Sequence, residues 1–402
     1  MKNSFKISYG KNVYDKKEIT AVIKTLNHST QMGKSVSKFE KEVSKHFNKK
    51  YALMVNSGTS AITLALNVLN ISAGDEVITP CLNFGTALSS IINSGAKPIL
   101  VDINLETLQI NEKLIEKKIN KKTKALLIPN LIGNIPNWKK IYKIAKNNNL
   151  KIIEDSADTL GASINNKPTG IYSDISITSF YGSHVISCAG NGGMMLTNNK
   201  LNYEKAKVLR SWGRMSTLLK DSENIKKRLK INLLGIEYDK KFVFSELGYN
   251  FEPSEIGAAF GLAQLKKLRL FSKIRNKNFY LHKEFFSKFE NLFILPKINY
   301  KVKTNFLAYP IIIKENKFFT KKKLQIFLEK NNIQTRPIFS GNILRHPAFK
   351  YLISKRNDVN NFFYSDYIMK NGILIGCHQG LKINDIKYIH NKISNFINKN
   401  FY

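Results

Sequence analysis

Short apolar runs alternate with longer amphipathic segments along the first two-thirds of the chain. The apolar runs are bounded by turn residues and fall at residues 51–55, 76–80, 98–101, 125–129 and 151–154. Between them, apolar residues recur at the spacing of one helix face in residues 61–70, 86–94 and 138–146. This alternation predicts strand–helix–strand units, and therefore an α/β fold with a mostly parallel central sheet and helices on both faces.

The pattern changes towards the C-terminus. Residues 175–198 are rich in strand formers and glycine, and a long helix is predicted to begin near Pro253 and Ser254. We expect this helix to lead from a large domain, residues 1–265, into a smaller α+β domain, residues 266–402. No repeat and no low-complexity linker separates the two, so we expect them to pack closely.

Composition narrows the class of protein. With 402 residues, 43% of them hydrophobic, the chain can bury a sizeable core. It has no apolar run of about 18 residues, and its first residues lack the apolar stretch of a secretion signal. The sequence therefore predicts a cytoplasmic protein without a membrane segment. Three scattered cysteines, Cys81, Cys188 and Cys377, are too few for a disulfide framework or a cysteine-based metal site.

The net charge of +35 raises the question of nucleic-acid binding. Only eight of the 64 basic residues are arginine, the residue best suited to pairing with base edges. The lysines are spread along the chain rather than gathered in one segment. We therefore interpret the charge as solvated surface and expect no nucleic-acid partner.

Three segments carry candidate chemistry. At the first, a strand gives way to a helix through Ser57, Gly58, Thr59 and Ser60. Such a turn offers backbone N–H groups and hydroxyls to an anion at the positive end of a helix, although a plain helix cap would have the same sequence.

The second segment places Asp155 and Asp158 just after an apolar strand, at the edge where ligands of open α/β sheets bind. A carboxylate there can hold a heterocyclic nitrogen protonated, or it can simply face water. In the third segment, Ser179, Tyr181 and His184 follow another strand and precede a glycine-rich stretch. A lone histidine is more often structural, but here the glycine-rich continuation lets the backbone pass close to a ligand, which makes a site a stronger alternative.

Together these segments resemble the DegT/StrS family of sugar aminotransferases, which use pyridoxal phosphate. Further ordered matches extend over nearly the whole chain: Glu40, Gly95 to Pro98 before Asp102, Leu247 to Asn250, Gln264-Leu265, Thr335 to Pro337 and Gly341-Asn342. The resemblance implies the fold type I aminotransferase architecture and a homodimer with shared active sites.

The resemblance also implies where the cofactor binds. The corresponding residues here are Gly58, Thr59, Ser60, Phe84, Asp155, Asp158, Ser179 and Asn250. Thr59, Ser60 and Ser179 are expected at the phosphate, and Asn250 is expected to reach it from the partner subunit. Phe84 is expected to stack on the pyridine ring, and Asp155 to pair with its nitrogen. Asp158 stands where most aminotransferases of the family carry glutamine.

One position departs from the aminotransferase pattern. His184 stands where these enzymes carry the lysine that binds the cofactor covalently, and no lysine lies between Lys167 and Lys200. The same replacement occurs in a branch of the family, the sugar 3-dehydratases that work with pyridoxamine phosphate. The resemblance to this branch also includes Tyr181, Asp158 and the Trp212-Gly213-Arg214 segment. It implies that His184 acts as the base, with Tyr181 beside it.

The branch divides by cysteine content. Its CDP-sugar members hold an iron–sulfur cluster on four cysteines, which this chain lacks, so we expect no such cluster. The chain is most similar to the type that acts on GDP-4-keto-6-deoxymannose and regenerates its cofactor from L-glutamate. Arg336, His346 and His378 are candidates for contacts with substrate. An aminotransferase-like enzyme, a 3-dehydratase of another nucleotide sugar such as a GDP-heptose, and a non-catalytic binding protein remain as alternatives.

Overall fold

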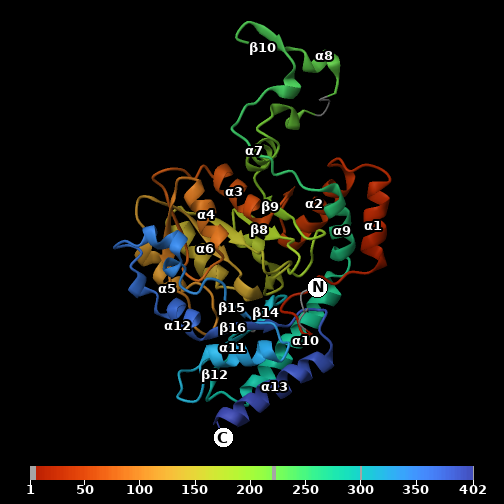
Figure 1. The fold of residues 1–402 in the computed structure, drawn as a ribbon. Coiled ribbons are helices and arrows are strands. Elements are labelled where there is room, and N and C mark those ends of the chain that lie inside the picture. The colour runs from red at the N-terminus through yellow and green to blue at the C-terminus, as the bar shows by residue number, and fades with distance from the viewer. Residues whose placement is uncertain (1–5, 220–222, 299–300, 402) are drawn as a thin grey trace.

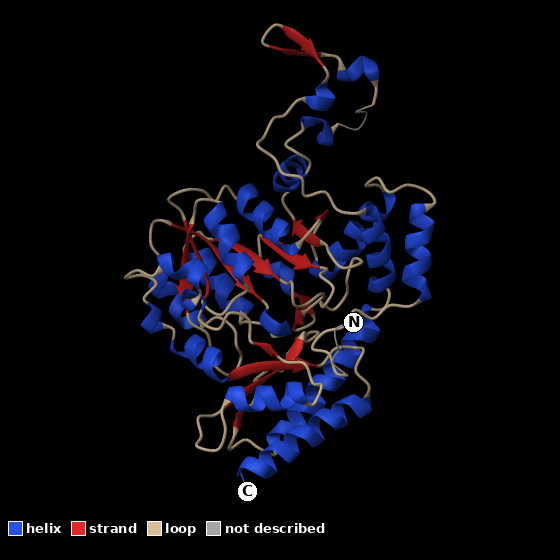
Figure 2. Cartoon of the chain, in the orientation of Figure 1, coloured by secondary structure: helices blue, strands red, loops and turns tan. Residues whose placement is uncertain are grey.

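The computed structural model describes residues 6–219, 223–298 and 301–401. In Figure 1 a broad body holds the larger sheet, a smaller layer containing the C-terminus lies below it, and an arm projects from the opposite side. Helices cover the sheets on their outer sides, as the colouring of Figure 2 makes clear. This arrangement is the α/β architecture that the alternating pattern predicts.

The larger sheet has seven strands in the order β1-β9-β8-β5-β4-β2-β3. Their bounds are β1 Tyr51–Val55, β2 Glu76–Pro80, β3 Lys97–Val101, β4 Thr123–Pro129, β5 Lys151–Asp155, β8 Ile175–Ser179 and β9 Gly193–Thr197. Strand β9 runs antiparallel to both of its neighbours, whereas the pairs from β8 to β3 are all parallel. The mostly parallel central sheet is confirmed.

Alternate residues of the central strands pack against helices on opposite faces. Leu127 of β4 belongs to the core cluster with α3 (Gly58–Val68), α4 (Gly85–Asn93) and α7 (Lys200–Arg210). Its neighbours Leu126 and Ile128 pack instead with α6 (Trp138–Asn147). Because strand side chains alternate between faces, a continuous apolar run is what a sheet covered on both sides requires.

The remaining elements complete the larger body. They are α1 Lys16–Leu26, α2 Lys34–Phe47, α5 Glu112–Ile115, α9 Glu255–Leu265, and a three-stranded sheet of β6 Ser163–Ile164, β7 Lys167–Pro168 and β13 Val302–Lys303. Helix α12 (Phe363–Asn371) packs between the larger body and the second sheet described below. Helices α2 and α9 pack on the β1–β9 end of the larger sheet.

A second sheet lies in what we call the small layer, which consists of this sheet with α10 (Leu268–Ser287), α11 (Lys321–Lys330) and α13 (Ile383–Phe401). Its strands run antiparallel in the order β12 (Phe293–Ile294), β14 (Ala308–Ile313), β16 (Gly372–Gly376) and β15 (Arg336–Pro337).

The long helix expected after Ser254 is two helices. Helix α9 ends at Leu265 and α10 begins at Leu268, so Lys266 and Lys267 separate them at the proposed domain boundary. Residues on both sides of that boundary also cross over: Ile7 packs in the core of the small layer, and Leu344 packs in the core of the larger body. The division into residues 1–265 and 266–402 stays a prediction.

The arm in Figure 1 is formed by residues 213–219 and 223–248 and includes α8 (Ile225–Arg228) and the hairpin of β10 (Ile231–Leu233) and β11 (Ile236–Tyr238). Gly213 closes its base, where an added Cβ would lie 1.9 Å from the Glu246 carbonyl oxygen. The arm exposes several large apolar side chains, namely Leu234, Ile236, Phe242, Phe244 and Leu247. Among the described residues, no helix has both the length and the apolar character needed to cross a bilayer.

Candidate active site

A cavity of about 730 Å³ opens between the carboxyl ends of the larger sheet's parallel strands and the small layer. Most of the residues singled out from the sequence line it: Gly58, Thr59, Phe84, Asp155, Asp158, Ser179, Tyr181, His184, Arg336 and His346. They meet because β1, β5 and β8 all end at this edge. The structure therefore gathers into one cavity residues that are separated by up to 288 positions in the sequence.

Three predicted residues do not line the cavity. The hydroxyl of Ser60 turns back to Asn56, donating to its Oδ1 at 2.6 Å. Asn250 is exposed at the base of the arm, so its expected role across a subunit interface stays a prediction. His378 is buried against the N-terminal segment, with Nε2 3.0 Å from the Ser8 carbonyl oxygen and Nδ1 accepting from the Gly380 N–H. Both ring nitrogens are thus occupied by backbone partners, and the geometry does not support a substrate contact.

The N-terminus of α3 forms one end of the cavity. The Ser57 hydroxyl caps the helix by accepting from the Ser60 N–H at 3.1 Å. Gly58 lets Ser179 come close, because a Cβ at residue 58 would lie 2.9 Å from the Ser179 Cβ. Thr59 and Ser179 therefore both line the cavity where an 11-residue helix presents its positive end. Hydroxyls and a helix N-terminus together suit a phosphate group.

Two buried carboxylates lie deeper in the cavity. Asp155 accepts one hydrogen bond among the described residues, from the Ala157 N–H at 2.9 Å, and burial raises its pKa to about 6. Asp158 accepts from the Ile132 N–H at 2.7 Å, and burial raises its pKa to about 7. Neither forms an ion pair in the described part of the chain. Such carboxylates suit a cationic partner, for example a protonated ring nitrogen.

A third carboxylate sits behind Asp155 and does not face the cavity. Glu154 is fully buried, and its oxygens accept from Asn130 Nδ2 at 3.0 Å, Ser156 Oγ at 2.9 Å and Ser176 Oγ at 2.8 Å. This set of neutral donors holds the negative charge in place. Its proximity adds to the raised pKa of Asp155 and so strengthens the preference of Asp155 for a cation.

His184 presents one free nitrogen to the cavity. Its Nδ1 lies 3.3 Å from the Ser179 carbonyl oxygen, and because a carbonyl only accepts, Nδ1 carries the proton. In the neutral imidazole this leaves Nε2 as the basic nitrogen. Burial lowers the pKa of His184 to about 4, so the ring is neutral at physiological pH. The ring of Tyr181 stands edge-on to it with centroids 6.0 Å apart.

The aromatic residues at the cavity are unusually open. The side chain of Phe84 is 59% exposed and that of Tyr181 is 58% exposed. The Phe84 ring meets Phe339 edge-to-face at 6.2 Å, which leaves its flat face free. A planar ring that stacks on Phe84 would have a phosphate site at the α3 N-terminus and carboxylates within the same cavity, so these residues fit pyridoxal or pyridoxamine phosphate.

The outer wall comes from β15 (Arg336–Pro337) and the chain that follows it. Arg336 is exposed and donates from Nη1 to the Thr335 carbonyl at 2.8 Å, which leaves donors free for an anion. His346 is fixed by its Nε2, 2.8 Å from the Ser340 carbonyl oxygen. Sequence spacing alone does not connect these residues with the strand ends of the larger sheet.

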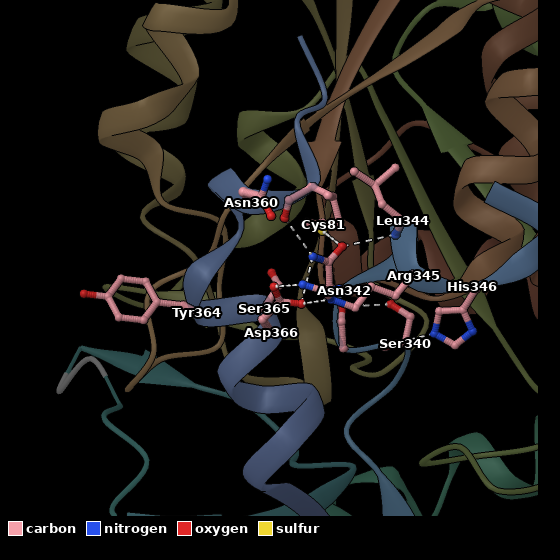
Figure 3. A network of polar contacts seen from close by, with 12 residues as sticks. Cys81, Ser340, Asn342, Leu344, Arg345, His346, Asn360, Tyr364, Ser365 and Asp366 are labelled. Atoms are coloured by element: carbon pink, nitrogen blue, oxygen red, sulfur yellow. Dashed lines mark hydrogen bonds and ion pairs between the residues drawn. The ribbon is translucent and has the colours of Figure 1, made fainter. Parts of the chain in front are cut away.

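Figure 3 shows how this wall is anchored, with Asn342 at the centre of a polar network. Asn342 Nδ2 donates to Asp366 Oδ1 of α12 at 2.9 Å, and its Oδ1 accepts from Cys81 Sγ at 3.2 Å and from the Leu344 N–H at 3.2 Å. The Gly341-Asn342 pair thus ties the segment carrying His346 to the end of β2.

Several cavity residues were missed by the sequence reasoning. They are chiefly Tyr9, Asn83, Asn191 and Ser340. Tyr9 belongs to the N-terminal segment, where no helix or strand pattern draws attention to it. Asn191 lies within the glycine-rich stretch that follows His184, so the glycines on either side of it are the feature by which the sequence could have indicated it.

The three cysteines occupy three separate apolar clusters. Cys81 packs in the core of the larger body, Cys188 near α2 and α9, and Cys377 in the small layer. No group of three or more metal-ligating side chains forms within the described ranges. The absence of an iron–sulfur cluster stays a prediction for a measurement of iron.

Comparison with known proteins agrees with this geometry. RfbH, a lipopolysaccharide biosynthesis protein of Salmonella typhimurium, is 32% identical over 90% of this chain and 85% of its own length. The GDP-4-keto-6-deoxy-D-mannose 3-dehydratase of Yersinia pseudotuberculosis is 31% identical over 92% and 93%. The solved structure of the Escherichia coli enzyme of that name, with bound hydrated pyridoxal phosphate, superposes with a TM-score of 0.85 at 28% identity, covering 97% of this chain and all of that one. The model of the DegT/DnrJ/EryC1/StrS aminotransferase family matches residues 12–394, and the chain belongs to that family.

Proposed function

We propose that this protein is a pyridoxamine-phosphate-dependent 3-dehydratase of a nucleotide-linked 4-keto-6-deoxy sugar, with GDP-4-keto-6-deoxymannose as the best candidate. The observation that carries the proposal is the imidazole of His184 at the place of the aminotransferase lysine. No lysine is among the residues that line the cavity in the described chain. Relatives named as sugar 3-dehydratases support the choice of reaction, and those named for GDP-4-keto-6-deoxy-D-mannose support the choice of sugar.

The cavity residues divide into those that hold the cofactor and those that handle protons. When bound, pyridoxamine phosphate supplies an amine for the sugar's ketone and a ring that accepts electrons. Thr59 and Ser179 would hold its phosphate, Phe84 would cover its ring, and Asp155 would pair with its nitrogen. All four side chains line the cavity, which supports these roles.

His184 is the residue that moves a proton. Its Nε2 is unprotonated, and the bond from Nδ1 to the Ser179 carbonyl fixes the ring. We assign to Nε2 the removal of a proton during elimination and the return of a proton to the departing C3 hydroxyl. A lysine amine here would instead compete for the cofactor's aldehyde form.

L-glutamate would supply the two electrons that the reaction needs. Overall, the sugar loses its C3 oxygen, and glutamate becomes 2-oxoglutarate and ammonium. The free donors of Arg336 at the mouth of the cavity suit either a glutamate carboxylate or the nucleotide diphosphate.

We further propose a homodimer in which Asn250 completes the partner's cavity. In the single chain Asn250 is exposed and does not line its own cavity, and the adjoining arm carries exposed apolar side chains. Sedimentation at low micromolar concentration should give a mass near 92 kDa, twice the 45.9 kDa of the chain. A stable monomer that retains activity would contradict this arrangement.

Mass spectrometry tests the reaction directly. GDP-4-keto-6-deoxymannose would be incubated with the protein, pyridoxal phosphate and L-glutamate. Loss of one oxygen from the sugar, with 2-oxoglutarate formed, is the expected result. A sugar that gains an amine would identify an aminotransferase, and glutamate conversion without a change in the sugar would point to another substrate, such as a GDP-heptose.

The choice of branch has its own measurement. The purified protein is expected to contain no stoichiometric iron and to show no charge-transfer absorption of an iron–sulfur centre. One cluster per chain, measured by elemental analysis, would overturn the assignment.

A further inference from the structure

A fully buried arginine of the small layer reaches the loop that carries His184. Arg275 lies on α10 with no exposed surface. Its Nε donates to Gln379 Oε1 at 2.6 Å, and its Nη1 donates to the carbonyls of Phe306 and Leu307, each at 3.0 Å. Its Nη2 donates to the His184 carbonyl at 3.3 Å. One guanidinium thus joins α10, the chain entering β14, the chain leaving β16, and the proposed base.

Gln379 supplies a second connection to the same loop. Its Nε2 donates to the Val185 carbonyl at 3.4 Å, while its Oε1 accepts from Arg275. Two consecutive carbonyls, of His184 and Val185, are therefore held from the small layer. The planar fork of an arginine can serve several carbonyls at once, which a lysine ammonium on a flexible stem does much less well.

The charge of Arg275 is not balanced by a carboxylate. Among the described residues it forms no ion pair, unlike Arg210, another buried arginine, whose Nη1 lies 3.2 Å from Glu40 Oε1. Burying a cation in this way is costly, so structural tethering alone is a poor reason for a charged residue here. Burial is the main cause of the lowered pKa of His184; the Ser179 carbonyl acts against it, and the positive charge of Arg275 lowers the pKa further.

We propose that Arg275 is a positioning residue for the reaction, which holds the His184 backbone at the cavity and places a fixed positive charge behind the imidazole. The inference rests on the proposed function, because it takes His184 as the base. Other ionisable groups line the same cavity and belong to the account, namely Tyr9, Asp155, Asp158, Tyr181, Arg336 and His346. Arg275 does not line the cavity, but its charge lowers the pKa of His184.

Three variants separate tethering from charge. Arg275→Gln removes the charge and most of the contacts, and Arg275→Lys keeps the charge. Gln379→Ala keeps the charge but releases the Val185 carbonyl. Asn278→Ala is the matched control, because Asn278 lies on the same helix and ties it to the carbonyls of Cys377 and His378 without touching the His184 loop.

The first readout does not depend on turnover. In the holoenzyme with ¹³C-labelled histidine, the His184 signal is assigned by its loss in His184→Asn and is followed against pH. We expect the His184 titration to move to higher pH in Arg275→Gln, because a nearby positive charge has gone. It should stay near its original position in Arg275→Lys, Gln379→Ala and Asn278→Ala.

The second readout is steady-state kinetics across pH. Arg275→Gln is expected to lower kcat about 100-fold with little change in KM, because a displacement of about 1 Å at the base can cost that much. The acid limb of its kcat-against-pH profile should also move to higher pH. Gln379→Ala should lower kcat without moving the limb, and Asn278→Ala should leave both unchanged.

The outcomes are distinct. If Arg275→Gln folds, and neither its His184 titration nor its kcat differs from those of the control, the inference is wrong. If Arg275→Gln does not fold, unchanged kcat in both Gln379→Ala and Arg275→Lys overturns it. If the wild-type protein does not dehydrate the sugar, the proposed function fails, and the NMR titration still decides whether Arg275 controls His184.

Discussion

Asp155→Asn is expected to stabilise the cofactor-free protein while weakening its hold on the cofactor. The Asp155 carboxylate is buried at the end of β5, accepts one hydrogen bond from the Ala157 N–H, and lies near the charge of Glu154. Burial raises its pKa from the ordinary 3.8 to about 6. The folded protein therefore binds this proton more tightly than the unfolded chain does.

The size of the effect follows from that difference in pKa. The stability contributed by the protonated group is fully present below pH 3.8 and is lost as the pH rises through 6. At 1.36 kcal/mol per pKa unit, the loss at pH 8 is about 3 kcal/mol. An asparagine is neutral at every pH, and its Oδ1 can still accept from the Ala157 N–H. The variant should thus gain up to about 3 kcal/mol at pH 8 and little at pH 4.

Urea unfolding of the cofactor-free protein, followed by circular dichroism at pH 4.5 and pH 8, measures the stability difference. Titration with pyridoxamine phosphate measures cofactor affinity, which should fall at least tenfold because the buried partner of the ring nitrogen has lost its charge. Asp174→Asn is the control, since Asp174 is partly exposed and accepts from the Ile152 N–H as an asparagine also can. A variant that is destabilised equally at both pH values and binds the cofactor normally would refute the reasoning.

The other predictions concern the base, the phosphate site and the small layer. His184→Lys should abolish dehydration and create weak amine transfer in the mass-spectrometric assay; retained dehydration would remove His184 from its role as base. Gly58→Ala should weaken cofactor binding and cost about 1–3 kcal/mol, because its Cβ would lie 2.9 Å from the Ser179 Cβ; calorimetry and thermal melting check both, and normal affinity would contradict the crowding. His282 and His390 are hydrogen-bonded at 3.0 Å, and burial lowers their pKa values to about 3 and about 4. Because the unfolded chain takes up these protons at a higher pH than the folded protein, the free energy of unfolding should fall as the pH drops from about 6.5 towards 4. Urea unfolding at several pH values should show a smaller fall for His282→Asn. An unchanged pH dependence in that variant would count against the pair.

The sequence by itself predicts much of the local structure of this protein. Runs such as residues 151–154 gave the strands of the larger sheet, because a strand covered on both faces needs consecutive apolar residues. The ends of these strands then placed Asp155 and Ser179 at one edge, since neighbouring parallel strands end together. The replacement of the family's lysine by His184 can also be recognised from the sequence alone, because it depends on position within a motif.

Local sequence patterns gave wrong predictions where one helix and two consecutive helices have the same pattern, and where two residues of one type have different roles. An amphipathic pattern does not reveal the short break at Lys266 and Lys267, so α9 and α10 read as one helix. His346 and His378 looked equally suited to substrate binding. The fold puts His346 at the cavity and encloses His378 among backbone partners.

Tertiary structure alone decided which distant segments complete the site. Hydrophobic periodicity says that one side of a segment is buried, but it does not say against what. Tyr9 therefore lines the same cavity as Asp158 and Arg336, although no motif near it in the sequence predicts this. The bond from Arg275 to the His184 carbonyl likewise spans 91 residues and depends on how the small layer docks. The sequence determined the reacting groups and the strands that present them, whereas the packing of the two layers determined what holds the base and shapes the wall around it, because such contacts form only when the chain has closed on itself.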